Sequence, residues 1–421
     1  MLVPSLLAVV QNPSRAAVAI LAAALTASAA AAQQPTAPPA ATRPDSAAKP
    51  DSASKGPTPA DTTPKISFGA FVDGYYAYDF GRPPTIDRSF AGGALFTTQP
   101  ARHNEFNINL AYVEAKLDAP RYHGRLAAQF GTSVQSNYFG EARVGQVSGP
   151  SVQQYLQEAF AGVKLGKNLW IDGGIFFSNT GMEGFVSRDQ LTYSRGLASE
   201  YSPYYSAGVR AIYTVSPTLT ARLDVVNGWQ NISENNSGKG AGVRLDYTPN
   251  ASTTFSYYDL FSDEAGTRLR TFNGVGAKVT AGRLTLLGEA DLGTQARPVG
   301  SDGHSTWYGL LGIARVQVAS LVALVGRVER YADPDQVILS TGSRNVQVAT
   351  PGGAGATVSV ANPAFRGNGA SIGVDVQPFS RVLFRTELRG FRNRDAVFPD
   401  GKNPDPRKAD GFAVTSLALT F

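Results

Sequence analysis

Apolar and polar residues alternate with a period of two over most of the chain. In 66–80, Ile66 and Phe68 lie at even positions, whereas Ser67 and Asp73 lie at odd positions. Such alternation predicts β-strands with one apolar face and one polar face. Sixteen runs of this kind can be delimited, at 66–80, 104–117, 121–132, 153–165, 168–177, 204–214, 218–230, 239–248, 252–261, 267–280, 283–294, 305–317, 321–331, 366–377, 381–392 and 411–421.

The connections between these runs alternate between short and long. Seven of them hold only two or three residues, such as 166–167 and 378–380, and the other eight are longer, such as 178–203 and 332–365. Sixteen antiparallel strands produce this alternation when both chain ends lie on the side of the short turns. The pattern therefore predicts an all-β, up-and-down antiparallel barrel with short periplasmic turns and long external loops.

The second run contains a change of parity. Phe106 and Ile108 lie at even positions, but Val113 and Ala115, further along the same run, lie at odd positions. One extra residue in a strand shifts its alternation in this way, because the extra residue has no partner on the neighbouring strand. We therefore predict a β-bulge near Ala111–Tyr112.

A soluble β-sandwich alternates as well, but the distribution of charge favours a barrel in lipid. The polar face is charged on many strands, as at Arg222, Asp224 and Lys278, whereas the opposite face is almost free of charge along the middle of each strand. A Lys or Arg on the lipid face costs about 2–4 kcal/mol at the bilayer midplane. A sheet in lipid must also close on itself, because hydrocarbon cannot satisfy unpaired strand edges. We therefore predict a transmembrane barrel.

The C-terminus and the aromatic residues agree with this interpretation. The last run places Leu417, Leu419 and Phe421 on one face and ends the chain with Phe. Bacterial outer-membrane barrels commonly end in this way, which predicts the barrel-assembly machinery as a partner. Aromatic residues near the run ends would form the two interfacial girdles: Tyr76, Tyr78, Phe80, Tyr122, Trp170, Tyr213, Trp229, Tyr247, Tyr257 and Trp307. For Trp229, the alternative is a place in the pore constriction.

The first 64 residues do not share the alternation. Residues 1–32 combine Arg15, the apolar run 16–25 and small residues after it, which is typical of a secretory signal peptide. Residues 33–64 are rich in Pro, Ala and Ser and hold almost no large apolar side chain, so we expect a disordered periplasmic linker. The predicted outer-membrane barrel then comprises 65–421.

Motifs between residues 173 and 247 resemble those of a known family. They are 173–183 (GGIFFSNTGME), 193–195 (YSR), 203–210, 226–230 (VNGWQ) and 234–242, and 71–78 and 106–110 look similar too. On these motifs the chain resembles the β-barrel porin-2 (OmpL-like) family of Gram-negative outer-membrane porins. The resemblance covers most of 66–421 and implies a channel-forming barrel, without implying a particular substrate. The insertion at 332–365 is atypical.

The long insertion 178–203 is the candidate for a pore constriction. A sixteen-stranded barrel is wide enough for water, so selectivity must come from a constriction and from lumen charges. We predict that the insertion folds inward and meets arginines of the wall; the alternative is that it covers the rim. Arg–Asp pairs across strands are a structural alternative for the wall arginines. The predicted constriction residues are Glu183, Arg188, Asp189, Arg195, Arg210, Arg222, Arg244, Arg327 and Arg385.

Composition narrows the range of functions. The 421 residues include no Cys and three His that are far apart, which disfavours thiol chemistry, a His-based metal centre and a catalytic triad. The net charge of +5 is spread along the chain, which disfavours nucleic-acid binding. We therefore expect no cofactor, no metal and no enzymatic activity. Because acids nearly balance bases, we expect weak ion selectivity that slightly favours anions.

These observations together predict an outer-membrane porin for passive diffusion of small hydrophilic solutes or ions. Outer-membrane lipid and these solutes are the expected partners, and a homotrimer stays open because trimers are common among sixteen-stranded porins. The alternative function is a structural or adhesive outer-membrane barrel whose channel activity is incidental. The Pro-rich 33–64 would then contact peptidoglycan or a periplasmic partner.

Overall fold

The computed structural model describes residues 63–264, 268–298, 300–348 and 356–421. The predicted signal peptide and nearly all of the predicted linker lie outside the described residues. Among the described residues, no helix is both long enough and apolar enough to cross a membrane. The connections between strands contain the short helices α3 (Thr132–Tyr138), α4 (Pro150–Gln153), η1 (Ser187–Asp189) and α5 (Leu197–Glu200).

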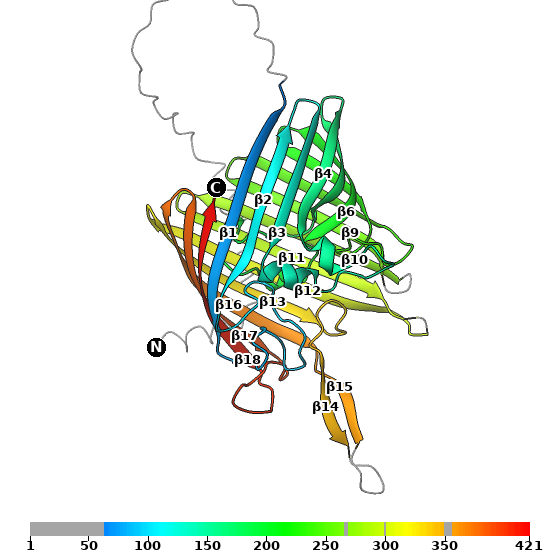
Figure 1. The fold of residues 1–421 in the computed structure, drawn as a ribbon, viewed down its shortest axis with the longest axis vertical. Coiled ribbons are helices and arrows are strands. Elements are labelled where there is room, and N and C mark those ends of the chain that lie inside the picture. The colour runs from blue at the N-terminus through cyan, green and yellow to red at the C-terminus, as the bar shows by residue number, and fades with distance from the viewer. Residues whose placement is uncertain (1–62, 265–267, 299, 349–355) are drawn as a thin grey trace, which may run out of the picture.

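Sixteen antiparallel strands form a closed barrel (Figure 1). Barrel strands that follow each other in the chain pair side by side, and β1 closes the ring against β18, with Tyr75 opposite Ser416. The predicted sixteen-stranded barrel is therefore confirmed. The barrel strands are β1 (Lys65–Asp79), β2 (Phe106–Asp118), β3 (Tyr122–Phe130), β4 (Leu156–Leu165), β5 (Leu169–Phe177), β6 (Tyr205–Ser216), β7 (Leu219–Val226), β8 (Gly240–Asn250), β9 (Thr253–Glu264), β10 (Arg268–Ala281), β11 (Leu284–Ala296), β12 (His304–Ala319), β13 (Val322–Asp333), β16 (Phe365–Phe379), β17 (Val382–Asn393) and β18 (Ala409–Thr420).

The β-bulge of β2 lies slightly before its predicted position. Asp73 of β1 pairs with Leu110 and the next residue, Gly74, pairs with Ile108, so Asn109 is the extra residue. The prediction near Ala111–Tyr112 was therefore wrong by about two residues. Leu110 and Ala111, which follow the bulge, are both apolar, so the alternation in the sequence shows the change of parity only beyond them.

Two connections differ from the sequence-based expectation. The seventh strand ends at Val226, and Gly228 and Gln230 have φ values of 142° and 55°, which turn the chain away from the ladder. The long insertion 332–365 contains a two-stranded hairpin of β14 (Ser343–Val348) and β15 (Ala356–Ala361), which projects from one end of the barrel in Figure 1. The hairpin forms its own two-stranded sheet outside the ring, so β13 and β16 are neighbours in the barrel and pair directly.

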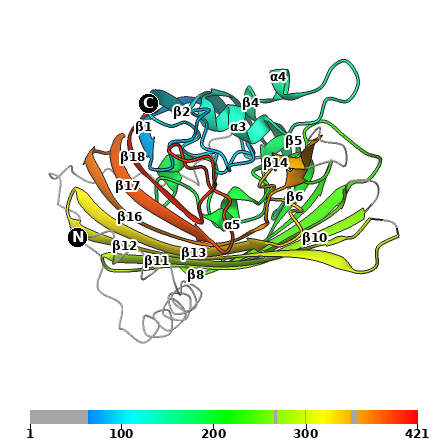
Figure 2. The ribbon, with the colours of Figure 1, turned by 90° about the horizontal axis from the view of Figure 1, so that it is seen from below.

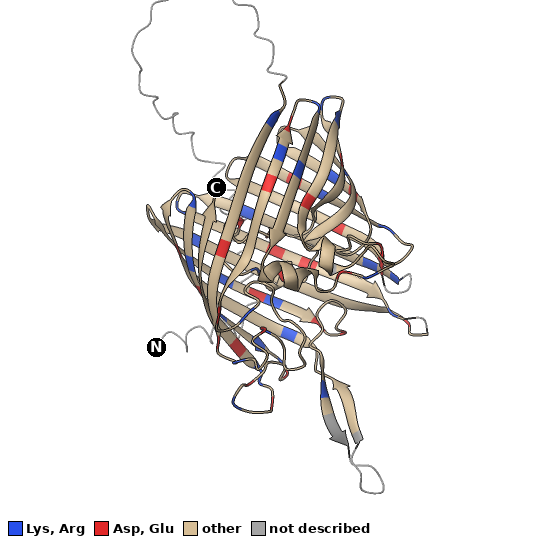
Figure 3. Ribbon diagram, viewed as in Figure 1, with Lys and Arg blue, Asp and Glu red and all other residues tan. Residues whose placement is uncertain are grey.

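The two faces of the barrel wall follow the alternation in the sequence. Leu126, Val209 and Leu223 are examples of large apolar side chains that are about half exposed on the outer face. Charged side chains such as Arg327 and Glu387 are buried on the inner face. Figure 3 shows acidic and basic residues on strands around the whole ring. An apolar exterior and a charged interior are what a barrel in lipid requires.

Apolar side chains from the long connections fill part of the barrel interior. Phe90 and Phe96, between β1 and β2, pack against Phe365 on β16, and Phe96 also meets Phe391 on β17. Phe398, between β17 and β18, joins the same cluster. Figure 2 shows these connections inside the ring of strands. The interior is therefore a packed hydrophobic core in one region and a charged surface in another.

Three of the aromatic residues predicted for the interfacial girdles face the interior instead. Trp307 is 1% exposed, and its ring centroid lies 6.1 Å from that of Trp229. Trp170 stacks on His123, with the ring centroids 4.2 Å apart. The girdle prediction was wrong for these residues because it used the distance from the strand ends alone. The parity of Trp170, two residues from the inward-facing Asp172, already favours the inner face.

Candidate functional site

The β5–β6 segment, residues 178–203, contacts strands that are distant in the sequence. Its backbone N–H groups donate to carboxylates on β11, β13 and β17. Met182 N donates to Glu289 Oε1 (3.0 Å), Leu197 N to Glu329 Oε2 (2.6 Å) and Ser194 N to Glu387 Oε2 (2.8 Å). Charged hydrogen bonds of this kind are roughly twice as strong as neutral ones.

Arginines on the inner faces of the strands donate to carbonyl groups near the start and near the middle of the segment. Near its start, Arg244 Nη1 donates to Asn179 O (3.0 Å) and to Gly181 O (2.8 Å). Near its middle, Arg385 donates to the carbonyls of 187, 190 and 192 at 2.7–3.0 Å. These contacts satisfy backbone carbonyls in a stretch that has little helix or strand to satisfy them.

A buried ionic network joins the segment to β13 and β17. Glu387 Oε1 accepts from Arg327 Nη2 (2.6 Å), and Arg389 Nη2 donates to Glu329 Oε1 (2.6 Å). Arg327 also donates to Ser194 O (2.6 Å), and Arg389 donates to Arg195 O (2.7 Å). The two arginine and two glutamate side chains are at most 2% exposed. Two cations and two anions balance each other, as buried charges require.

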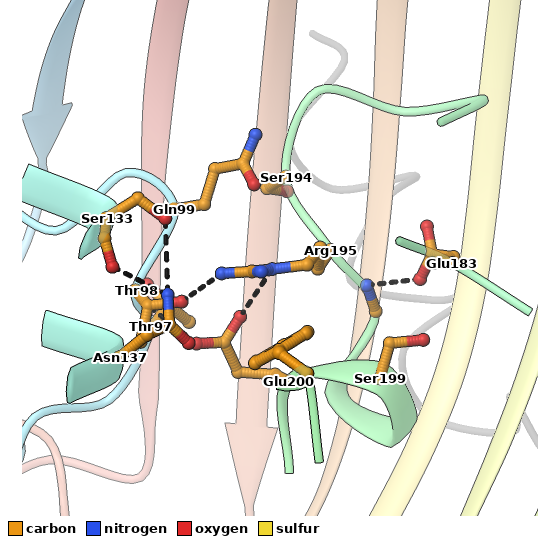
Figure 4. A network of polar contacts seen from close by, with 12 residues as sticks. Thr97, Thr98, Gln99, Ser133, Asn137, Glu183, Ser194, Arg195, Ser199 and Glu200 are labelled. Carbon is orange, nitrogen blue, oxygen red and sulfur yellow. Dashed lines mark hydrogen bonds and ion pairs between the residues drawn. The ribbon is translucent and has the colours of Figure 1, made fainter. Parts of the chain in front are cut away.

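Arg195 connects the β5–β6 segment to the β1–β2 connection (Figure 4). Its guanidinium donates to Thr98 Oγ1, and its Nε lies 3.5 Å from Glu200 Oε2. The same carboxylate accepts from Thr98 N through Oε1 (2.6 Å). The guanidinium carbon also lies 3.9 Å from the ring centroid of Tyr204, a cation–π contact. Arg195 therefore has no exposed surface and binds protein groups.

Burial raises the pKa of two acidic residues of the segment. Glu183 Oε2 accepts from Gly196 N (2.7 Å), but burial raises the pKa of Glu183 above its ordinary value, although Arg327 opposes this effect. Burial likewise raises the pKa of Asp189, which Arg188 and Arg385 oppose. Burial therefore favours the neutral form of both groups.

The structure brings most of the sequence-predicted site residues together. Arg210, Arg244, Arg327 and Arg385 each donate to a backbone carbonyl between Phe177 and Ser194. Arg188 donates to Arg381 O (3.1 Å) in the β16–β17 turn and to Thr420 Oγ1 (2.7 Å) at the end of β18.

Arg222 is the exception among the predicted wall arginines. In the described part of the chain it makes no hydrogen bond to the segment, and its ion pair is with Asp246 at 3.9 Å. The physical reason is the strand register. Arg222 lies directly opposite Arg244, and it is Arg244 that donates to the segment. The expectation that Arg222 meets the segment was therefore wrong.

The sequence analysis missed a second group of residues beside the segment. Tyr138 of α3 stacks on Tyr205 at 4.3 Å, and Tyr205 donates its hydroxyl to Glu141 Oε2 (2.8 Å). Val134 and Tyr138 belong to the same buried cluster as Phe185 of the segment. The four-residue spacing of Val134 and Tyr138 was the one available signal, because it fits the face of a helix rather than a strand.

Two cavities lie against different parts of the segment. One, of about 800 Å³, is lined by Phe96, Arg102 and Phe139, together with Glu200 and Tyr201. The other, of about 150 Å³, is lined by residues from 177 to 189 and by Pro203 and Tyr204. No residue lines both cavities.

Comparisons with known proteins agree on one class. A family model described as "Putative beta-barrel porin-2, OmpL-like" matches residues 65–421. No curated protein sequence matches the chain.

Three solved structures show the same architecture. The anion-selective porin from Comamonas acidovorans has a TM-score of 0.53 and 10% identity, over 85% of this chain and 100% of its own. OmpT of Vibrio cholerae has a TM-score of 0.52 and 9% identity, over 86% and 99%. Salmonella typhi OmpF, solved in complex with daunomycin, has a TM-score of 0.52 and 14% identity, over 85% and 97%. At these identities the similarity shows the fold.

Proposed function

The chain belongs to the OmpL-like beta-barrel porin-2 family, and from this membership we propose that it is an outer-membrane porin. Small hydrophilic solutes or ions diffuse passively through its water-filled lumen. The short turns face the periplasm and the long loops face the exterior. Residues 1–32 direct export, and 33–64 form a periplasmic linker.

The β5–β6 segment narrows the channel in this proposal. The observation that supports it is the set of buried charges on β11, β13 and β17 that bind the segment's backbone inside the wall. A segment held by so many charged hydrogen bonds resists displacement by passing solutes, because each bond to a charged group contributes about 1.5–3 kcal/mol. The sizes of the solutes that pass are then set by this narrowing.

The proposal also covers partners and chemistry. Outer-membrane lipid surrounds the barrel, the assembly machinery reads the strand that ends at Phe421, and three copies form the assembly. In this proposal the channel has no enzymatic activity, and the inner-wall His123 packs against Trp170 and Phe160 and pairs with Asp172.

The experiment is conductance of the purified full chain in planar bilayers, together with liposome swelling by sugars of graded size. In one variant, residues 184–193 are replaced by a short Gly-Ser linker; we expect a larger unit conductance and a higher size limit. As a control, shortening the β14–β15 hairpin leaves both unchanged, because that hairpin projects away from the ring of strands. A wild type that forms no channel would refute the porin function, and an unchanged size limit in the linker variant would refute the constriction.

A further inference from the structure

Positive charge on the inner wall is not balanced equally around the ring. On β2 to β4 the cations are paired: Arg125 forms ion pairs with Glu114 and with Glu158, and Lys116 pairs with Glu114 at 2.9 Å. On β6 and β7, Arg210 and Asp224 form two hydrogen bonds of 2.7–2.8 Å. These groups contribute little net charge to the lumen.

Arg222 on β7 is different because it shares its acid. Asp246 accepts from Arg244 Nε at 2.9 Å, whereas its nearest contact with Arg222 is 3.9 Å. Arg222 and Arg244 are also directly opposite each other, an arrangement in which like charges repel. The Arg222 side chain is 35% exposed, so two cations with one carboxylate leave a positive charge in contact with lumen water.

Lys278 on β10 has no counter-ion among the described residues. It lies on the inner face, because a Cβ on Gly276, two residues earlier, would come within 2.2 Å of Met182 in the β5–β6 segment. Its cross-strand neighbours are the uncharged Thr254 and Leu287. Lys278 is exposed. On the neighbouring β11, Glu289 is buried, and it accepts from Tyr258 and from Met182 N.

Two other cations that were predicted from the sequence as constriction residues contrast with Arg222 and Lys278. Arg327 has a side-chain exposure of 0%, and Arg385 one of 5%. Both donate to the backbone of the β5–β6 segment. A charge that is enclosed by protein and paired has little effect on an ion in water, whereas an exposed, unpaired charge raises the local concentration of its counter-ion.

We propose that Arg222 on β7 and Lys278 on β10, both on the inner wall near the short turns, are the residues that make this channel prefer small anions over cations. The inference rests on the proposed porin function. The solutes concerned are small inorganic anions and carboxylates, which the two side chains attract without forming a closed binding site. Arg244, Arg327 and Arg385 then hold the β5–β6 segment and contribute little to the choice of ion.

The test is the reversal potential of the full chain in planar bilayers under a KCl gradient. We expect chloride to be more permeant than potassium in the wild type. Each of Lys278→Glu and Arg222→Glu should lower the ratio of chloride to potassium permeability about fivefold, because reversing a unit charge about 7 Å from an ion in screened water disfavours chloride and favours potassium by the same amount. The double variant should prefer potassium. Lys278→Met should give about half the effect of Lys278→Glu on the logarithm of the permeability ratio, because it changes the charge by one unit rather than by two.

Lys402→Glu is the matched control, since Lys402 is an exposed residue of the β17–β18 connection; its ratio should equal that of the wild type. Lys278 forms no ion pair with the part of the chain that the structure describes, so its variants remain informative even if Arg222→Glu does not fold. A conducting wild type whose ratio is unchanged in Lys278→Glu would overturn the inference and leave the porin function intact. A cation preference in the wild type would overturn it as well. Absence of conductance would overturn both.

Discussion

Replacing Glu387 by Gln tests whether the buried network holds the β5–β6 segment in place. Oε1 of Glu387 accepts from Arg327 Nη2 at 2.6 Å, and Oε2 accepts from Ser194 N at 2.8 Å and from Ser194 Oγ at 2.9 Å. Glutamine has nearly the same shape but one oxygen and one NH₂ group. Whichever way the amide is oriented, a donor then faces a donor.

The magnitude follows from the balance of charge. In the variant, Arg327 and Arg389 face the single carboxylate of Glu329, and all three side chains are 0% exposed. Removing one partner of a buried ion pair costs about 3–5 kcal/mol. If half of the lower figure falls on the attachment of the segment, that attachment weakens by about 1.5 kcal/mol, which raises the population of the displaced segment about tenfold.

Single-channel recording measures this population directly. We expect Glu387→Gln to spend about ten times longer than the wild type in a state of higher conductance, while the folded barrel keeps its heat-modifiable migration in electrophoresis. Glu114→Gln is the control, because Glu114 also pairs with an inner-wall arginine, and its ion pairs among the described residues are with Arg125 and Lys116 of the wall rather than with the segment. Identical conductance histograms for wild type and Glu387→Gln would show that the network does not hold the segment.

Two further substitutions test separate parts of the interior. Because burial raises the pKa of Glu183 above 4.5, the ionised form of Glu183 disfavours folding, and the stability present at low pH is lost as the pH rises through the raised pKa. Glu183→Gln should therefore unfold at a higher urea concentration than the wild type at pH 8, but at the same urea concentration near pH 4. A difference in urea midpoint that does not change with pH would contradict this reasoning. A Cβ at position 162 would lie 2.1 Å from Asp172 Oδ1 and 2.4 Å from His123 Nε2, so Gly162→Ala should break the hydrogen bond between these two side chains and lower the free energy of unfolding in urea by about 1–2 kcal/mol. Gly173→Ala is the control, because nothing lies within 4 Å of the added Cβ, and it should lower the free energy of unfolding by less. Equal losses in the two variants would refute the steric reason.

The strands could be predicted closely because alternation reports directly on the two faces of a wall. A side chain in lipid must be apolar, and its neighbours in the chain must then face the lumen, so Arg210, Arg327 and Arg385 could be assigned to the interior from parity alone. The family could be identified from local motifs because these keep their order in the chain.

The partners of those side chains could not be predicted in the same way. Nothing in the sequence indicates that Arg327 is enclosed by the β5–β6 segment whereas Arg222 is exposed, because that difference depends on register across several strands. The helix α3 was missed because seven residues give too short a pattern to distinguish from a loop. The β14–β15 hairpin was missed because its strands belong to no barrel face.

The buried network also constrains how the chain folds. Ser194 and Glu387 are 193 positions apart, and Arg188 and Thr420 are 232 positions apart. Contacts between such distant positions form slowly, since the chain between them must lose its freedom first. The β5–β6 segment therefore becomes ordered only when the C-terminal strands have joined the wall. A truncated chain without β16 to β18 would lose Arg385, Glu387 and Arg389, which bind the segment, together with the seam of the barrel, so the segment cannot reach its final position before the cylinder is complete.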